Sequence, residues 1–463
     1  MRSAAASTLV VPLAVVLVAC GTAATAARPT PPPVRIGAIY NLTGAQAPLD
    51  APSLDGARLA VDRINAHGGL MGRRVELLER DGQTSEAAVR RAAASLVASG
   101  CSAIIGLSDT DQVLAAAPIA ASAGVPFVTS GATSPRLTRQ IPNWLFLACF
   151  GDNAQAAASA QFATDQLGAR TAAILYDKGT DYTRLLAKYF ERSFRAQGGK
   201  VLATADFTKP AQAVRRLKVA SATGVAKGPE SSATSSGSSG EQSSSSQSES
   251  QSSGSTAGET SSAGQSSASG ESTSGGASGS GGGSAANGAS GASAAASADL
   301  LFVAAGPEDA ARIVRNLRAA GFDQPIIGGD SFDSPTLIST AEKTGGKVYY
   351  TTHAAVGMSS ASRAVRRFDA SYQAAYGLPP ANAFAALGYD AVDLVAAAIK
   401  RADSVNPAAV RDAIQATRHV PGVTGSLSYD AKDQVPSKKV TVVCVGRRPV
   451  VVAQFTPGYV PQP

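Results

Sequence analysis

A short stretch of small and hydroxyl-bearing residues, Ser130-Gly131-Ala132-Thr133-Ser134-Pro135, follows the apolar run Val125–Thr129. The run predicts a buried strand, and Pro135 suits the first turn of a helix with Thr133 or Ser134 as its cap. Small side chains would let backbone N–H groups approach a ligand, and a helix start favours a bound carboxylate. The stretch is therefore a candidate anion-binding turn, although small residues are also usual in ordinary strand-to-helix turns.

Such a turn needs a sheet edge to hold it, because ligands in open α/β sheets bind at the carboxyl ends of the strands. Apolar runs predict strands at Val34–Tyr40, Arg74–Glu79, Cys101–Gly106, Val125–Thr129, Trp144–Cys149, Thr171–Tyr176, Lys200–Phe207, Leu300–Ala304, Pro325–Gly328, Lys347–Thr352, Val440–Val445 and Val450–Phe455. Periodic apolar stripes predict helices between them, including Ser85–Ala98, Ala154–Leu167, Tyr182–Gln197, Ala211–Val219, Asp309–Ala320, Ser362–Ala375, Phe384–Ala402 and Pro407–Thr417. This alternation indicates an α/β fold with mostly parallel sheets, and its renewal after residue 149 predicts two lobes.

The N-terminus carries the features of an export signal. Arg2 precedes the apolar run Leu9–Val18, which is too short to span a membrane. Cys20 directly after Leu17-Val18-Ala19 resembles the lipobox of bacterial lipoproteins, where cleavage leaves that Cys lipidated; a soluble signal cut elsewhere is the alternative. Residues 21–33 are rich in Ala, Thr and Pro and predict a solvated tether. We expect an exported protein, lipid-anchored to the outer face of the cytoplasmic membrane or in the periplasm.

A low-complexity segment interrupts the pattern from Ser221 to Ser297. It consists mainly of Ser, Gly, Ala, Gln and Glu, and has no Lys or Arg after Lys227. Such a segment cannot bury enough apolar surface to offset the entropy of ordering, so we expect disorder. Its ends meet a predicted helix and the strand Leu300–Ala304, which makes it an insertion within the second lobe. A passive spacer is the simpler interpretation, and a glycosylated or envelope-interacting segment is the alternative.

Composition narrows the classes of partner. The 463 residues include 41 Lys and Arg against 34 Asp and Glu, a net charge of +7, with only 5% aromatics. The basic residues are scattered, so the pattern of a nucleic-acid-binding protein is missing. The three Cys beyond the signal, Cys101, Cys149 and Cys444, allow one disulfide, and three buried thiols is the simpler expectation. No Cys/His cluster has metal spacing, and no cofactor is expected.

An ordered series of motifs resembles a known family. The motifs are Val34–Gly44, Leu54–Asn65, Gly68–Leu77, Ile104-Ile105-Gly106, Thr129–Pro135, Gly388–Val392 and Pro421–Gly425. Together they resemble the type I periplasmic binding proteins, closest to the leucine/isoleucine/valine-type solute-binding proteins of ABC importers. The resemblance covers about residues 34 to 455 apart from the insertion. Gly68-Gly69 is expected to stop a helix and turn into the next strand.

The resemblance implies two Rossmann-like lobes that close on a ligand around three crossovers. The crossovers are expected near Cys149–Asp152, Thr352–Ala355 and Gly425–Ser428. Lobe I would comprise 34–149 plus 355–426, and lobe II 150–354 plus 427–455, with the insertion 221–297 inside lobe II.

The same resemblance implies a site for an α-amino acid. Carried over to this chain, it predicts that loops of lobe I hold the zwitterion through Ser108, Asp109, Thr110, Ser130, Ala132 and Thr133. From lobe II, Tyr182 would cover the ligand and Asp330 would pair with its ammonium. Simpler roles stand beside these: Thr110 and Asp330 could be helix caps, and Tyr182 could pack in the core.

Two departures leave the ligand open. Some relatives place an aromatic residue near Leu49, and others place one after the strand Leu300–Ala304, where this chain has Ala305-Gly306. Pocket shape therefore does not follow from the resemblance, and a branched aliphatic, polar, amide or aromatic ligand remains possible.

Two rival functions are weighed. Gly329-Asp330-Ser331 superficially resembles an esterase nucleophile block, but His67, His353 and His419 are the only candidate bases. We therefore expect no enzyme activity. A ligand sensor or envelope-assembly factor could use the same fold. The favoured function is a monomeric solute-binding lipoprotein that delivers a small amino-acid-like ligand to an ABC permease.

Overall fold

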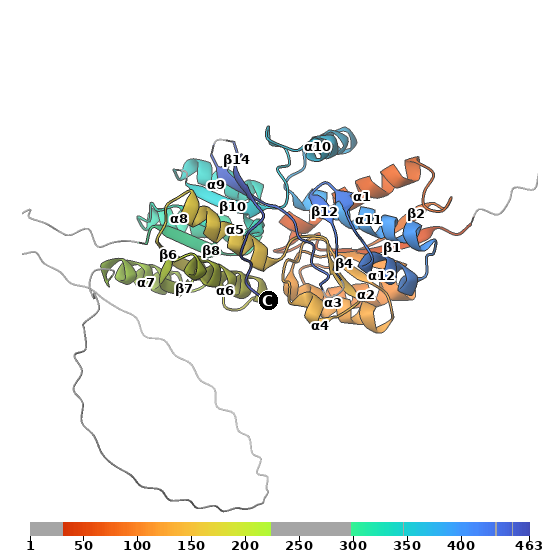
Figure 1. The fold of residues 1–463 in the computed structure, drawn as a ribbon, viewed down its shortest axis with the longest axis horizontal. Helices are drawn as coiled ribbons and strands as arrows, with labels where there is room; N and C mark the ends of the chain where they lie inside the picture. Colours follow the sequence, from red (N-terminus) through yellow and green to blue (C-terminus); the bar gives the residue numbers. More distant parts are fainter. Residues whose placement is uncertain (1–30, 224–297, 346, 431–432, 447) are drawn as a thin grey trace, which may run out of the picture. The chain divides into compact units, whose positions relative to one another are not determined.

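The computed structural model of the protein describes residues 31–223, 298–345, 347–430, 433–446 and 448–463. The predicted export signal with Cys20 lies outside the described residues, as does nearly all of the predicted insertion. The described chain forms two separate sheets and a small hairpin (Figure 1). This confirms the predicted α/β class with mostly parallel sheets.

The first sheet has five parallel strands in the order β2-β1-β3-β4-β5. They are β1 Val34–Tyr40, β2 Val75–Asp81, β3 Ala103–Gly106, β4 Phe127–Thr129 and β5 Leu145–Leu147, drawn in red to orange in Figure 1. Two buried cores cover its faces. One contains residues of α1 Ala47–Ala66, α11 Phe384–Ala402 and α12 Pro407–Gln415. The other contains residues of α2 Glu86–Ala98, α3 Thr110–Ser122 and α4 Leu137–Gln140.

Glycines set the spacing of α1 and α11. A Cβ on Gly56 would lie 1.8 Å from the carbonyl oxygen of Ala385, and one on Gly388 would lie 1.8 Å from that of Ser53. The two backbones can approach this closely only because neither position carries a side chain. The contact brings residues far apart in the sequence against the first sheet, where α10 Arg363–Tyr376 packs beside them.

The second sheet has seven strands in the order β14-β13-β10-β9-β8-β6-β7. Its parallel part consists of β6 Thr171–Tyr176, β7 Lys200–Asp206, β8 Leu300–Ala304, β9 Ile326–Gly328 and β10 Val348–Thr352, and the antiparallel strands are β13 Val440–Val445 and β14 Val450–Phe455. One face is covered by α5 Asp152–Asp165 and α6 Asp181–Ala196. The other is covered by α7 Pro210–Thr223, α8 Pro307–Ala319 and α9 Pro335–Lys343.

The chain passes between the two sheets three times, after β5, after β10 and after the hairpin of β11 Val420–Gly422 and β12 Gly425–Leu427. The last passage occurs later than the predicted Gly425–Ser428. Leu427 pairs in the hairpin, and Tyr429 packs against Phe146 in the first core with ring centroids 5.5 Å apart. The lobe boundaries remain a prediction.

Three local expectations differ from the structure. The helix after β4 begins at Leu137 with Arg136 as its cap, not at Pro135 with Thr133 or Ser134, and it has only four residues. The strands β4 and β5 are shorter than predicted. Cys101 and Cys149 are buried thiols, whereas Cys444 is only half-buried.

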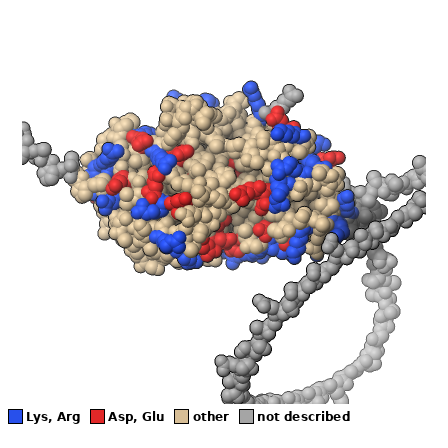
Figure 2. Space-filling model, turned by 180° about the vertical axis from the view of Figure 1, so that it is seen from behind, with Lys and Arg blue, Asp and Glu red and all other residues tan. Residues whose placement is uncertain are grey.

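The surface of the described chain has mixed charge. On the face in Figure 2, Lys and Arg side chains lie among Asp and Glu. Within the described ranges, none of the helices combines the length and hydropathy needed to cross a membrane.

Gly68 and Gly69 have φ of +90° and +77°, which confirms the predicted turn after α1.

Candidate ligand-binding site

A cavity lies where loops from the carboxyl ends of both sheets meet. It has about 280 Å³ of empty space, part of it continuous with solvent. It is lined by Gln46, Leu49, Ser108, Asp109, Gly131, Thr133, Tyr182, Gly306, Pro307, Asp330, Ser331 and Phe384. All but Phe384 follow parallel strands, from β1 to β9, so the cavity occupies the place where α/β sheets bind ligands.

Asp330 is the most elaborately held side chain of the cavity. It is 2% exposed and stands in the 3₁₀ turn Asp330–Phe332 after β9. Its Oδ1 accepts from the Tyr182 hydroxyl at 2.8 Å and from Gln155 Nε2 at 3.0 Å, and its Oδ2 lies 3.0 Å from His353 Nε2. A carboxylate offers about four acceptor positions, so a further donor can be accommodated.

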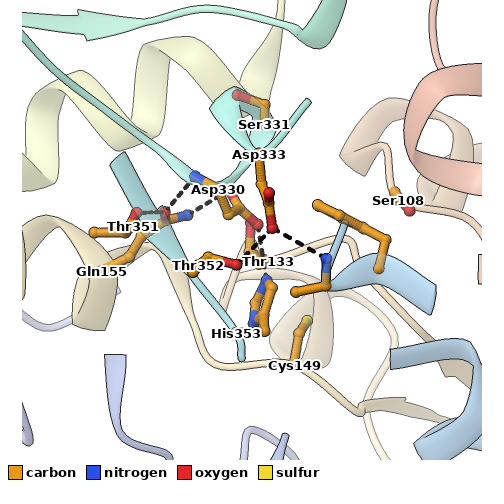
Figure 3. Close-up of polar contacts among 12 residues, drawn as sticks. Ser108, Thr133, Cys149, Gln155, Asp330, Ser331, Asp333, Thr351, Thr352 and His353 are labelled. Carbon is orange, nitrogen blue, oxygen red and sulfur yellow. Dashed lines mark hydrogen bonds and ion pairs between the residues drawn. The ribbon is translucent and has the colours of Figure 1, made fainter. Parts of the chain in front are cut away.

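Gln155 lies beside Thr351 and Asp330 (Figure 3), and through Asp152 it connects the Asp330 carboxylate to Thr133 on the other side of the cavity. Its Nε2 donates to both Asp330 Oδ1 and Asp152 Oδ1, and its Oε1 accepts from Thr351 Oγ1 at 2.7 Å. Asp152 Oδ1 in turn accepts from Thr133 Oγ1 at 2.7 Å. The Thr133 hydroxyl therefore donates its hydrogen bond within the protein. Its oxygen can still accept a hydrogen bond from a ligand.

His353 is a buried, neutral partner of Asp330. Its ring stacks on Phe150 with centroids 3.9 Å apart, and burial lowers the pKa of the imidazole despite the adjacent carboxylate. A neutral imidazole has one N–H, and the short contact to Asp330 assigns it to Nε2. The other ring nitrogen, Nδ1, has no hydrogen-bond partner in the described part of the chain.

A second polar group surrounds the start of α3. The Ser108 hydroxyl donates to Asp50 Oδ1 at 2.5 Å, and Asp109 caps the helix by accepting from the Gln112 N–H at 3.0 Å. Gln46 Nε2 donates to the other carboxylate oxygen of Asp109 at 3.3 Å. Thr110 is 2% exposed, and its hydroxyl has no partner among the described residues.

Burial perturbs four carboxyl groups in or beside the cavity. It raises the pKa of Asp50 and Asp152 to about 7 and that of Asp109 and Asp333 to about 6. Repulsion adds to burial in each case, from Asp109 on Asp50 and from Asp330 on Asp152. These groups hold their protons more tightly than exposed carboxyls do.

The structure brings together five of the eight residues predicted for the site: the cavity lining includes Ser108, Asp109, Thr133, Tyr182 and Asp330. Ser130, Ala132 and Thr110 are buried and do not line it.

The expected cradle of free N–H groups is wrong. The N–H of Ser130 donates to Gly106, that of Gly131 to Leu107, and that of Ala132 to the Thr129 hydroxyl. The short helix α4 adds no extended dipole beside this turn. An anion would instead meet the 13-residue helix α3, whose first N–H groups lie at Thr110.

The structure also decides the simpler roles, helix capping and core packing, that the sequence left open for Thr110, Asp330 and Tyr182. Asp109 rather than Thr110 caps α3, and Ser334 rather than Asp330 caps α9. Tyr182 reaches Asp330 with its hydroxyl, so it does more than pack in the core.

The sequence interpretation missed two lining residues, Gln46 and Phe384. It also missed the polar residues behind the lining, namely Asp50, Asp152, Gln155 and Asp333. Asp152 and Gln155 stand three residues apart at the start of a helix, a spacing that puts both on one face and was the available signal. His353, which the sequence suggested as a candidate base, is a partner of Asp330.

The groups of the esterase alternative do not assemble. Ser331 Oγ donates to the Ala305 carbonyl at 2.5 Å and lies 3.0 Å from the Tyr182 hydroxyl. Its hydrogen-bond partners in the described chain include no imidazole, which this mechanism requires as base. Among the described residues, no group of three His, Cys, Asp or Glu side chains is placed to hold a metal.

Comparison with known proteins gives the family. A family model described as periplasmic binding protein matches residues 33–234 and 282–448. Leu/Ile/Val-binding protein BraC3 of Rhizobium johnstonii is 31% identical over 167 residues, which are 36% of this chain and 45% of that protein. Leu/Ile/Val-binding protein homolog 8 of Brucella abortus is 33% identical over 113 residues, 24% and 28% of the two chains. The matches thus span less than half of these curated relatives.

Solved structures share the fold. The branched-chain amino acid transporter substrate-binding protein LivJ from Streptococcus pneumoniae, in complex with isoleucine, superposes with a TM-score of 0.68 at 24% identity, covering 91% of this chain and 98% of that one. A solute-binding protein of an ABC transporter from R. palustris, in complex with benzoate, gives 0.67 at 17% identity, covering 93% and 98%. At these identities the likeness concerns the fold. Because the family model covers most of the sequence, the chain belongs to the periplasmic binding protein family, whose members are solute-binding proteins that act outside the cytoplasm.

Proposed function

We propose that the protein is the solute-binding component of an ABC importer and captures a small α-amino-acid-like solute. The observation that carries this is Asp330, a buried carboxylate that lines the cavity and is held in place by Tyr182, Gln155 and His353. A carboxylate with an open acceptor position and no Lys or Arg beside it in the described chain suits an ammonium group.

The cavity offers a position for each end of a zwitterion. The ligand ammonium would lie between Asp330 and the Thr133 oxygen, which has given its own proton to Asp152. The ligand carboxylate would lie toward the start of α3, where the positive end of the helix dipole favours an anion. Excluding water on closure strengthens both pairings.

The relatives support the same class of ligand and transport. The names of the curated relatives state Leu, Ile and Val binding, and LivJ was solved with isoleucine. By analogy, an ABC permease is the partner that would receive the solute, with the present protein acting as a monomer. Cys20 would anchor it by lipidation at the outer face of the cytoplasmic membrane, and several acyl chains would make that anchoring stable.

The test is ligand binding to the exported part of the chain from Arg28 onward, without Cys20. In a thermal-shift and calorimetric screen of amino acids, a ligand at 100 times its dissociation constant should add ~2.7 kcal/mol of stability. Asp330→Asn keeps the shape of the side chain and removes its charge. We expect it to weaken binding by more than ~1.4 kcal/mol, about tenfold in affinity.

The matched control is Asp323→Asn, which removes an exposed carboxyl just before β9 and should leave affinity unchanged. Equal affinity of Asp330→Asn and the original protein for every hit would refute the ammonium-partner role. Absence of any α-amino-acid hit would refute the proposed ligand class.

A further inference from the structure

The cavity carries more negative charge than one ammonium group can neutralise. Both Asp109 and Asp330 line it, and the lining set contains no Lys or Arg. Asp109 comes from the loop after β3, whereas Asp330 comes from the turn after β9. The two carboxyl groups therefore belong to different sheets and approach the cavity from different sides.

Two further carboxyl groups stand directly behind the lining, and because burial raises the pKa of each to about 7, they add only part of a negative charge. Asp50 contacts the Ser108 hydroxyl, and Asp152 contacts that of Thr133. Both are fully buried, and the structure records no Lys or Arg ion pair to either within the described residues. Asp152 Oδ2 also has no hydrogen-bond donor in the described chain. The buried lysine of this region, Lys438, lies 3.9 Å from Asp390 instead.

The lining that contains the two carboxylates is apolar in part. Leu49, Pro307 and the ring of Phe384 line the same cavity. Such a surface suits a methylene stem, with its polar ends directed to Asp109 and Asp330. Gln46 and Ser108 add hydrogen-bonding atoms beside Asp109. An aliphatic side chain placed here would bury the Asp109 carboxylate without a counter-charge, which is unfavourable once water is excluded.

We propose that the ligand carries two cationic groups separated by an aliphatic stem, as in the α-amino acids ornithine, lysine and arginine. Asp330 binds the α-ammonium, and Asp109 binds the cation of the side chain. This specificity rests on the proposed function, because it assumes an α-amino acid in the same cavity. The charge of the cavity, and not the fold of the protein, would distinguish this protein from binders of branched aliphatic amino acids.

The experiment compares lysine with norleucine, which replaces the side-chain ammonium by a methyl group, and adds ornithine, arginine, leucine, valine and the diamine cadaverine. Titration calorimetry on the exported chain should show lysine, ornithine or arginine binding at least about tenfold more tightly than norleucine and leucine. Cadaverine, which lacks the carboxylate, should bind more weakly than lysine.

Asp109→Asn tests the residue itself. Asn is as good an N-cap as Asp, so α3 keeps its start. We expect the variant to lose at least about tenfold in affinity for the best cationic ligand and to keep or gain affinity for norleucine. Asp111→Asn, which removes a half-buried carboxyl of α3 outside the cavity lining, is the control and should retain the preference.

The outcomes separate the two proposals. Tighter binding of leucine or norleucine than of all cationic amino acids, or an unchanged preference in Asp109→Asn, would overturn the cationic specificity and leave the amino-acid-binding function standing. If no α-amino acid in the panel binds, both proposals fall.

Discussion

Gln155 determines how the Asp330 carboxylate is oriented. Its amide donates to Asp330 and Asp152 and accepts from the Thr351 hydroxyl and from the backbone N–H of Asp330. All four contacts are buried, and a buried polar group left unpaired costs about 1–3 kcal/mol. The amide therefore holds a carboxylate of one loop and, through Asp152, the Thr133 hydroxyl of another in a single network. Ligand contacts on the two sides of the cavity are thereby linked.

The buried carboxyl groups predict how stability depends on pH. The pKa of Asp50 is raised from its ordinary 3.8 to about 7, chiefly by burial, so the folded protein keeps a proton that the unfolded chain releases. Between pH 4 and 7 this group makes the free energy of unfolding fall as pH rises, by up to ~1.4 kcal/mol per pH unit, and above pH 7 its effect is constant.

Asp50→Asn isolates this contribution, because Asn resembles the protonated carboxyl. Urea unfolding of the ligand-free protein at pH 4.5, 6 and 7.5 should show the variant gaining stability relative to the original protein as pH rises. A difference between the two proteins that is the same at all three pH values would show that Asp50 does not titrate in this range.

The residues of the site differ in how far the sequence could reveal them. Thr133 could be singled out from its place after a recognisable strand, whereas Asp330 and Tyr182 were predicted through the resemblance to the family. Gln155 and Asp330 are 175 positions apart, and nothing local in either segment indicates their contact. The two carboxyl groups that line the cavity, Asp109 and Asp330, likewise come together only in the folded chain.

At the scale of elements, the contact of α1 with α11 depends on the absence of a side chain at residue 56. Gly56→Ala would place a Cβ 1.8 Å from the Ala385 carbonyl oxygen, and backbone atoms cannot yield as a flexible side chain can. We expect the helices to separate, at a cost of about 1–3 kcal/mol or more in the free energy of unfolding. Chemical denaturation monitored by circular dichroism measures it.

Gly458→Ala is the control, since a Cβ there meets nothing within 4 Å. Its stability should stay within about 0.5 kcal/mol of the original. If Gly56→Ala matched this control, the close approach of the two helices would not exist in solution.

Most elements could be predicted because their apolar periodicity is strong and their ends carry turn residues. Phe384–Ala402 and Val440–Val445 have the predicted bounds. The start of α4 could not be predicted, because a distant contact decides it. Thr133 accepts the N–H of Asp152 at 2.7 Å and donates its hydroxyl to the same residue, which ties the turn to the next segment and delays the helix.

At the scale of the whole described chain, the three passages between the sheets converge on a few polar residues. Lys438, on the third passage, donates to the Ala148 carbonyl, on the first, at 2.5 Å. It also donates to Thr424 Oγ1 at 2.6 Å. On the second passage, burial chiefly lowers the pKa of the His353 imidazole, and the charge of Lys438 adds a smaller effect in the same direction. The polar network thus joins segments that must bend together if the lobes move about the crossovers.

The buried pair of Lys438 and Asp390 gives a prediction for the stability of this junction. Both side chains are fully buried, 3.9 Å apart. Asp390 accepts two backbone N–H groups, from Val423 and Thr424, but Lys438 is the cation beside it in the described chain. Lys438→Met keeps the aliphatic stem and removes the charge, leaving a buried carboxylate uncompensated. We expect the free energy of unfolding to fall by about 3–5 kcal/mol.

The double variant Lys438→Met/Asp390→Asn separates charge from packing. Neutralising Asp390 removes the uncompensated carboxylate and keeps one acceptor oxygen, so one of the hydrogen bonds from the N–H groups of Val423 and Thr424, which reach different oxygens, is retained. The double variant should therefore be more stable than Lys438→Met alone, and the non-additivity measured by urea unfolding gives the coupling between the two side chains. Because each passage between the sheets contributes a neighbour to Lys438, a coupling near zero would mean that the passages are joined by packing alone, and the hinge would then bend without straining a buried ion pair.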